Sequence, residues 1–220
     1  MNILVIAPHR DDEVIGVGGT IAKYSSLGNS VYVCIITHGT EPICSADLDN
    51  KIKNECIEAD KLLGVRRTIF FNYPAAMLET VPRYELNSAL IKLVQEIKPD
   101  IVYIPHRGDM QLDHKMTVDA AMVALRPKYE HVVKKIYCYE TLSETGWDVP
   151  NVTNEFIPTC YNDISDYLER KIDAMKVFTT QIAEYPNPRS PEAIRALAMY
   201  RGATVNIIAA EAFSLVREIS

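Results

Sequence analysis

Residues 2–13 read NILVIAPHRDDE, a short apolar run that leads directly into a histidine and three acidic residues. A continuous apolar run of this length is typical of a strand buried on both faces of a parallel sheet. Three carboxylates at the end of such a strand repel one another, and a divalent cation would offset their charge. The stretch therefore predicts an α/β fold with a metal-dependent site where the first strand ends.

The rest of the first 140 residues continues this alternation of apolar runs and amphipathic stretches. Gly28 and Gly64 follow two of the amphipathic stretches, at positions where a left-handed helix cap is usual. Strands that alternate with helices predict a mostly parallel, Rossmann-like sheet with helices on both faces. The predicted strands are 2–7, 30–36, 67–71, 100–104 and 134–140, and the predicted helices are 13–27, 47–63, 84–97 and 113–125.

The pattern changes after Glu140. Residues 143–158 are irregular and contain prolines, which predicts a loop over the sheet. Two helices are expected beyond it, 163–181 with Asp163 as its cap and 187–202 with Ser190 as its cap. We expect one domain, 1–220, in which 1–140 form the α/β core and 141–220 form a C-terminal helical extension packed on it.

The chain has 220 residues, a formal net charge of -6 and 48% hydrophobic residues, which is ordinary globular composition. Its mild acidity offers no attraction for a polyanion, so nucleic acid is not expected as a partner. The five cysteines form no CxxC pair, which disfavours a disulfide framework or a cysteine-rich zinc site. There is no apolar stretch of membrane-spanning length and no secretory signal, so we expect a cytoplasmic protein, with homo-oligomerisation left open.

A second polar cluster, PHRGDMQLDH at 105–114, follows the fourth predicted strand. Ligands of open parallel sheets bind in the crevice beyond the carboxyl ends of the strands, and both clusters leave the sheet at that edge. The topology alone can therefore bring the side chains of the two clusters together. The polar residues that can meet there are His9, Asp11, Asp12, His106, Asp109, Asp113 and His114.

These residue types are those of a catalytic zinc site, which needs three protein ligands and one open position for water. His9 and Asp12 lie three residues apart and can bind one ion together, and a histidine from the second cluster would complete the set. Asp11 would then be free to act as a base, because a bound metal lowers the pKa of water from 15.7 to about 7. The spacing predicts a metal-assisted hydrolase without specifying its substrate.

At these residues the chain resembles the LmbE-like, PIG-L family of zinc-dependent de-N-acetylases. The stretch APHRDDEVIGVGGT at 7–20 fits the first motif of the family, and GDMQLDH at 108–114 fits the second. The likeness continues in YETLSETGW at 139–147 and YRGATVNIIAAEAFSLVR at 200–217, so it covers essentially the whole chain.

The resemblance implies that His9, Asp12 and His114 bind zinc or another divalent metal. It implies that Asp11 is the general base and that Asp113, next to His114, orients the site. The implied substrate is a small molecule in which an amino sugar of the N-acetylglucosamine type carries the acetyl group.

The chain departs from the family pattern at two site positions. Gln111 stands where many members have a histidine that steadies the oxyanion, and an amide can donate a hydrogen bond but cannot be a cationic acid. We expect Gln111 to belong to the catalytic site, with weaker assistance to the oxyanion. Arg10 stands where proline is commoner, and with Arg107 and Arg201 it is a candidate cation at the rim of the crevice.

Each candidate also has a structural interpretation. Acids such as Asp12 stabilise the N-terminus of a following helix, Asp113 can cap its own helix, and Asp109 suits a turn after glycine. His38 and His106 can be loop histidines bonded to backbone. A helix cap explains one acid but does not explain a histidine together with three acids, so we favour the metal site.

Three other functions were considered. One is a zinc amidohydrolase of the same family that acts on a non-hexosamine amide. Another is a degenerate metal-binding or sugar-binding protein, in which Gln111 would mark the loss of catalysis, although the intact Asp11 argues against it. A nucleotide-binding domain predicts a GxGxxG turn after the first strand, where this chain has PHRDDE.

Overall fold

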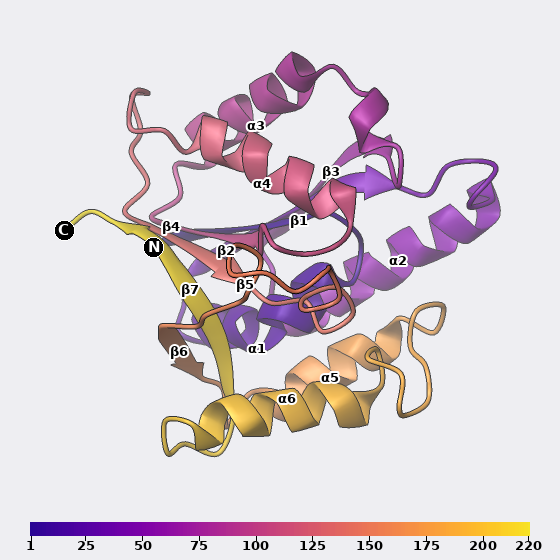
Figure 1. Ribbon diagram of the computed structural model, residues 1–220, viewed down its shortest axis with the longest axis vertical. Helices are drawn as coiled ribbons and strands as arrows, with labels where there is room; N and C mark the ends of the chain where they lie inside the picture. The colour runs from indigo at the N-terminus through magenta and orange to yellow at the C-terminus, as the bar shows by residue number, and fades with distance from the viewer.

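The computed structural model describes residues 1–220 as a seven-stranded sheet between two layers of helices (Figure 1). The strands lie in the order β3-β2-β1-β4-β5-β7-β6, and β1 to β5 pair in parallel. All five predicted strands are present, with β2 and β3 extended beyond their predicted ends. The strands are β1 (Asn2–Ala7), β2 (Ser30–His38), β3 (Arg67–Pro74), β4 (Ile101–Pro105), β5 (Lys135–Tyr139), β6 (Cys160–Asp163) and β7 (Ala210–Glu218).

Helices cover both faces of the sheet, as predicted. Figure 1 shows α3 and α4 on one side of the sheet and α1, α2, α5 and α6 on the other. None of them is both long and apolar enough to span a membrane. The helices are α1 (Asp12–Ser26), α2 (Ala46–Leu63), α3 (Arg83–Ile97), α4 (Leu112–Ala124), α5 (Leu168–Val177) and α6 (Pro191–Ala203), with a 3-10 turn η1 (Leu78–Thr80) before α3.

The strand β1 supplies both hydrophobic cores. Successive side chains of a strand point to opposite faces of the sheet. Ile3 and Val5 therefore pack among the helices α1, α2, α5 and α6, whereas Leu4 and Ile6 pack against α3 and α4. All four side chains are fully buried, which explains why the sequence of β1 is apolar without alternation.

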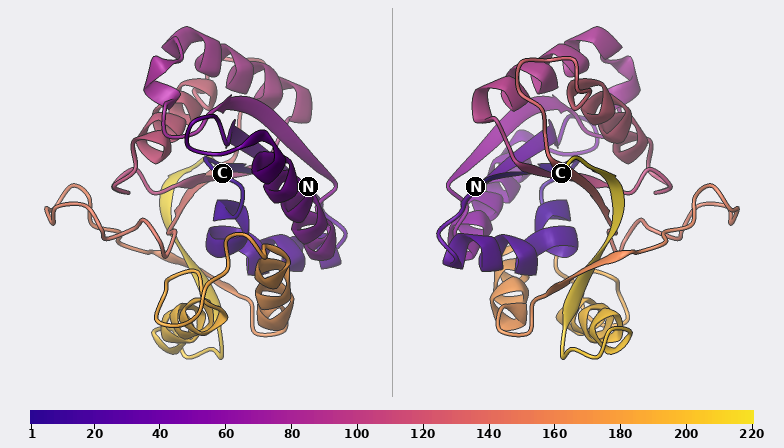
Figure 2. Two further views of the ribbon diagram at one scale, coloured as in Figure 1. Left: turned by 90° about the vertical axis from the view of Figure 1, so that its right-hand side faces the viewer. Right: turned by 90° about the vertical axis from the view of Figure 1, so that its left-hand side faces the viewer.

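The C-terminal part of the chain departs from its prediction. The predicted helix 163–181 begins only at Leu168, because residues 160–163 form β6. Asp163 does not cap a helix, and its carboxylate instead accepts the backbone N–H of Ser165 (2.9 Å). Residues 210–218, for which no strand was predicted, form β7, which runs antiparallel to both β5 and β6. Figure 2 shows the segment between β5 and β6 projecting from the body of the molecule.

The helix α1 lies close enough to the sheet to require glycine. A Cβ atom on Gly16 would lie 2.3 Å from the Tyr139 ring on β5, and one on Gly19 would lie 2.7 Å from Ile164. The Tyr139 hydroxyl donates to the carbonyl of Ile6 on β1 (3.0 Å). These contacts fix the first turn of α1, which carries two of the acidic residues, relative to β1 and β5.

The strands that follow β1 in the sequence are added first on one side of it and then on the other. From β1 it proceeds through β2 to β3 at one edge and then returns to place β4 on the other side of β1. The loops that follow β1 and β4 diverge at such a point and leave a crevice, which is where open α/β sheets bind ligands. Both polar clusters of the sequence lie in these two loops.

A buried ion pair joins the C-terminal region to α1. The Lys171 ammonium on α5 donates to Glu211 on β7 (2.6 Å) and to the carbonyl of Ile15 (2.7 Å). The Glu211 carboxylate also accepts the backbone N–H groups of Gly19 (2.8 Å) and Thr20 (2.7 Å). Lys171 and Glu211 are each less than 5% exposed, so water cannot replace either partner of the pair.

We expect Lys171→Met to lower the free energy of unfolding by about 3–5 kcal/mol, because it leaves the Glu211 carboxylate buried without a cation. Urea denaturation followed by circular dichroism measures the change. The double variant Lys171→Met/Glu211→Gln should recover most of the loss, since no charge is then left unpaired. Arg195→Met, which removes an exposed ion pair with Glu169, should leave the midpoint unchanged. A midpoint for Lys171→Met equal to that of wild type would contradict this account.

Candidate active site

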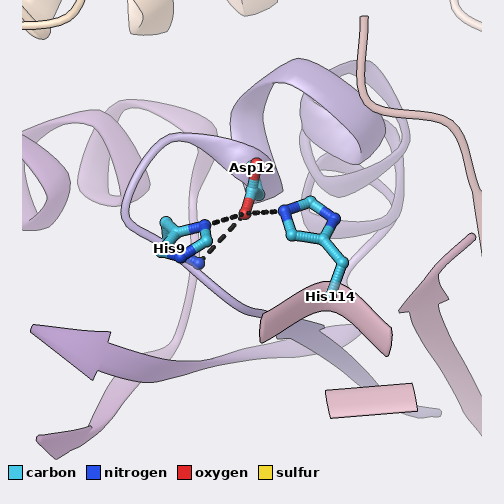
Figure 3. A group of neighbouring side chains, drawn as sticks. All are labelled: His9, Asp12 and His114. Carbon is cyan, nitrogen blue, oxygen red and sulfur yellow. Dashed lines mark hydrogen bonds and ion pairs between the residues drawn. The ribbon is translucent and has the colours of Figure 1, made fainter. Parts of the chain in front are cut away.

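The loops after β1 and β4 bring His9, Asp12 and His114 together (Figure 3). Asp12 begins α1 and His114 lies in the first turn of α4. One carboxylate oxygen of Asp12, Oδ2, lies 3.3 Å from His9 Nδ1 and 3.3 Å from His114 Nε2. The same oxygen accepts the backbone N–H of His9 (3.0 Å), which closes the loop between them.

Asp113 contacts the His9 imidazole at the ring nitrogen that does not face Asp12. His9 Nε2 lies 3.1 Å from Asp113 Oδ2, and the carboxylate also accepts the backbone N–H groups of Ala76 (2.6 Å) and Leu78 (3.3 Å). These bonds hold the pKa of Asp113 below its usual range despite burial. Because an ionised carboxylate only accepts, Nε2 carries the proton and Nδ1 is left to face Asp12. Asp113 therefore orients His9 and does not cap its own helix.

The His114 imidazole is held in the same way by Asp109. His114 Nδ1 lies 2.8 Å from Asp109 Oδ2, and Asp109 Oδ1 accepts the hydroxyl of Thr145 (2.6 Å). Both His114 and Asp109 are fully buried. The interpretation of Asp109 as a turn residue misses this contact. A carboxylate five residues before a histidine that could bind a metal is the signal that could have indicated it.

The three residues fit a divalent cation. Their ligand atoms all lie within 4.8 Å of one another, and His114 Nε2 is buried without a hydrogen-bond partner. Two imidazoles and one carboxylate are the donor set of three-ligand catalytic metal sites. A carboxylate behind each imidazole is the usual support for metal-ligating histidines.

The electrostatics of this group favour positive charge between the ligand atoms. Burial would lower the pKa of His9, but its contacts with Asp113 and Asp12 raise it to about 9. Burial would likewise lower the pKa of His114, but Asp12 and Asp109 raise it to about 10. The two histidines hold the pKa of Asp12 far below its usual range. The negative charge of the carboxylates around the two imidazoles can be balanced either by two imidazolium protons or by one divalent cation.

Asp11 directly precedes Asp12, and its side chain lines the same hollow as His9. Its backbone φ of 129° is unusual for a residue other than glycine, and its N–H donates to Glu13 Oε2 (3.0 Å). Its carboxylate accepts from Arg189 Nε (2.9 Å), while Oδ1 is buried without a partner. Burial and the neighbouring charge of Asp12 raise the pKa of Asp11 to about 6, against the lowering effect of Arg189. Such a carboxyl can accept and return a proton near neutral pH.

The sequence patterns did not predict that Arg189 belongs to this site. It lies in the loop before α6, 178 positions from Asp11, and no local spacing connects the two residues. The C-terminal region therefore contributes directly to the site.

A hollow of about 290 Å³ opens over this group. Gln111 lines it and immediately precedes α4, without a side-chain bond that caps the helix. Glu144, from the segment after β5, lines it from the opposite loop. Six of the side chains around the hollow are His9, Asp11, His38, Gln111, Glu144 and Arg189.

The three rim arginines proposed from the sequence lie in different places. Arg10 is buried at the hollow, where it pairs with Asp49 (2.5 Å). Arg107 is exposed and pairs with Asp119 (2.9 Å). Arg201 pairs with Glu140 (2.6 Å) and does not line the hollow.

The two remaining histidine candidates bond to backbone carbonyls. His38 Nδ1 lies 2.8 Å from the carbonyl of Gly39, and the residue also lines the hollow. His106 Nε2 lies 3.1 Å from the carbonyl of Asn154. His106 is not among the residues around the hollow and is not brought to the ligand group.

A family model described as PIG-L, GlcNAc-PI de-N-acetylase, matches residues 4–125. A probable N-acetyl-alpha-D-glucosaminyl L-malate deacetylase 2 of Bacillus anthracis is 26% identical over 193 residues, which span 83% of this chain and 82% of that protein.

Two solved structures share the fold. The N,N'-diacetylchitobiose deacetylase of Pyrococcus horikoshii superposes with a TM-score of 0.79 at 25% identity, over 98% of this chain and 83% of that one. The 4-carboxy-2-hydroxymuconate hydratase GalB of Pseudomonas putida superposes with a TM-score of 0.81 at 19% identity, over 100% of this chain and 97% of that one. The second likeness concerns the fold alone.

We expect Asp109→Asn to weaken the binding of a divalent cation by about 10–100-fold, because the amide no longer fixes His114 with its Nε2 lone pair facing Asp12. Competition with a chromophoric chelator measures the affinity for Zn²⁺. Asp119→Asn, which alters an aspartate of the same segment whose partner is the exposed Arg107, is the control. Equal affinities of the two variants would show that Asp109 does not support the site.

Proposed function

The chain belongs to the PIG-L family of GlcNAc-PI de-N-acetylases and is an N-deacetylase, and from this premise we propose that it hydrolyses the acetamide of an N-acetylated amino sugar. The observation that carries the proposal is the combination of a three-ligand metal group with an adjacent buried carboxyl, Asp11, in one hollow. Relatives named for GlcNAc-malate and for diacetylchitobiose support a sugar of the N-acetylglucosamine type.

His9, Asp12 and His114 would hold a divalent cation, which we propose to be zinc. When bound, such an ion polarises a carbonyl and makes water a nucleophile at neutral pH. Asp113 and Asp109 keep the two imidazoles in the tautomer that leaves a lone pair toward Asp12. Hydrogen bonds also fix the carboxylates of Asp113 and Asp109, so the imidazole nitrogens are in position before a metal ion binds.

Asp11 is the general base in this proposal. Its carboxylate takes a proton from the water that attacks the acetyl carbon, and Arg189 holds the carboxylate in place. The Gln111 amide faces the same hollow and donates a hydrogen bond to the oxygen on which negative charge develops. In this proposal, attack and proton removal depend on residues from the loops that precede α1, α4 and α6.

We expect the wild-type protein to release acetate from at least one member of a panel containing N-acetylglucosamine, GlcNAc-malate and diacetylchitobiose. Asp11→Asn should lower kcat by at least about 10²-fold, because it removes the base and keeps the shape. Chelation should abolish the release and added Zn²⁺ should restore it. Release from a non-sugar N-acetyl amine alone would point to the non-hexosamine amidohydrolase, and no release from any member would indicate a binding protein.

We expect Arg189→Met to shift the acid limb of the pH profile of kcat/KM to higher pH. Asp11 must be deprotonated to act as a base, and Arg189 lowers its pKa. Removing the cation therefore raises that pKa, and a higher pH is needed for the same deprotonated fraction. Arg189→Lys keeps the charge and should shift the limb less. An acid limb unchanged in Arg189→Met would refute the assigned pairing.

A further inference from the structure

Amide hydrolysis needs a second proton transfer, and the residues assigned so far do not supply it. An amine leaves only after its nitrogen has been protonated, since an amide anion is too basic to depart. Asp11 removes a proton at the earlier step, and the Gln111 amide has no acidic proton to give. The inference that follows rests on the proposed deacetylase function and concerns the source of this proton.

Glu144 is the other carboxyl group at the hollow besides those of Asp11 and of Asp49, which is bound to Arg10. It lies in the segment between β5 and β6, shortly after the end of β5 at Tyr139. Its side chain is partly buried and makes no hydrogen bond or ion pair within the chain. It is therefore a carboxyl that lines the hollow without a structural partner.

The backbone around Glu144 is tied to the metal-ligand group. The Glu144 N–H donates to the carbonyl of Thr141 (2.8 Å), which closes a turn. The next residue, Thr145, donates its hydroxyl to Asp109 (2.6 Å), which in turn holds His114 (2.8 Å). These hydrogen bonds hold the backbone at Glu144 in a fixed position relative to His114.

The surroundings of Glu144 favour its acid form. Burial raises its pKa above the usual range, and the charge of Asp12 adds to the shift. The charges of His114, Arg189 and His9 act in the opposite direction without reversing it. Substrate in the hollow excludes further water and so extends the effect of burial.

We propose that Glu144 is the catalytic acid that protonates the leaving nitrogen, a role that Gln111 cannot fill. The O–H bond of the Glu144 carboxyl breaks as an N–H bond forms on the tetrahedral adduct. The C–N bond then breaks with its electron pair going to nitrogen, and a neutral amine leaves beside acetic acid. Asp11 returns its proton to solvent and Glu144 takes one from solvent, so that protons and charge balance over the cycle.

The test compares two substrates that differ in their need for this proton. The first is the N-acetylated sugar of the panel that wild type cleaves best, and the second is 4-nitrophenyl acetate, whose phenolate leaves without protonation. We expect Glu144→Gln to lower kcat for the sugar by about 10²-fold and to change ester turnover by less than about threefold. Glu144→Asp, which keeps an acid on a shorter side chain, should recover at least about tenfold of the loss.

The ester serves as an internal control, because its turnover by Glu144→Gln shows that this variant is folded and loaded with metal. Asp11→Asn should lose activity on both substrates, since both need the base. An equal loss on both substrates in Glu144→Gln would assign Glu144 a structural role, and full activity on the sugar would leave Asp11 as the only acid. Either result overturns the proposal for Glu144 and leaves the deacetylase function intact, whereas failure of wild type on every sugar removes both.

Discussion

Buried negative charge at the end of β1 is the constraint on which the rest of the site depends. Asp11, Asp12 and Glu13 follow one another and are all at most 1% exposed. Carboxylates at such depth are tolerated only with cations, metal ions or hydrogen-bond donors close by. The partners come from far away in the sequence, with His114 from the loop after β4 and Arg189 from the loop before α6. Burial and the charge of Asp60 raise the pKa of the third acid, Glu13, well above its usual range, so that it is neutralised and not paired.

Two successive sets of contacts surround the Asp12 carboxylate. In the inner layer, Asp12 shares one oxygen between two imidazoles. In the outer layer, each imidazole has its own carboxylate, whose remaining oxygen positions are bound by backbone N–H groups for Asp113 and by a hydroxyl for Asp109. Such a shell fixes tautomer and orientation, so that the donor atoms do not have to rearrange when a cation or substrate binds.

Short-range sequence patterns predicted the elements whose structure depends on neighbouring residues in the chain. The unbroken apolar run of β1 and its polar continuation predicted the switch point and the meeting of His9, Asp12 and His114, because strand burial and strand ends are visible in a few neighbouring residues. The strands β6 and β7 were missed because β6 has only four residues and β7 takes its place by pairing with the free edge of β5. Arg189 and Glu144 were missed for a related reason. Each is one charged residue in a loop, and its role depends on which distant loop it meets in the folded chain.

The fold does not determine which reaction takes place at the switch point. The hydratase GalB shares this architecture over 100% of this chain, and both hydration and amide hydrolysis add water to a substrate. The two reactions differ in what happens next, since hydration of a carbon–carbon double bond needs a proton on carbon, whereas amide hydrolysis needs one on the leaving nitrogen. The shared fold therefore assigns neither reaction, and the proposal for this chain rests on the residues of its own hollow. Among those residues are Gln111 and Glu144, and the Glu144 carboxyl has no hydrogen-bond partner within the chain.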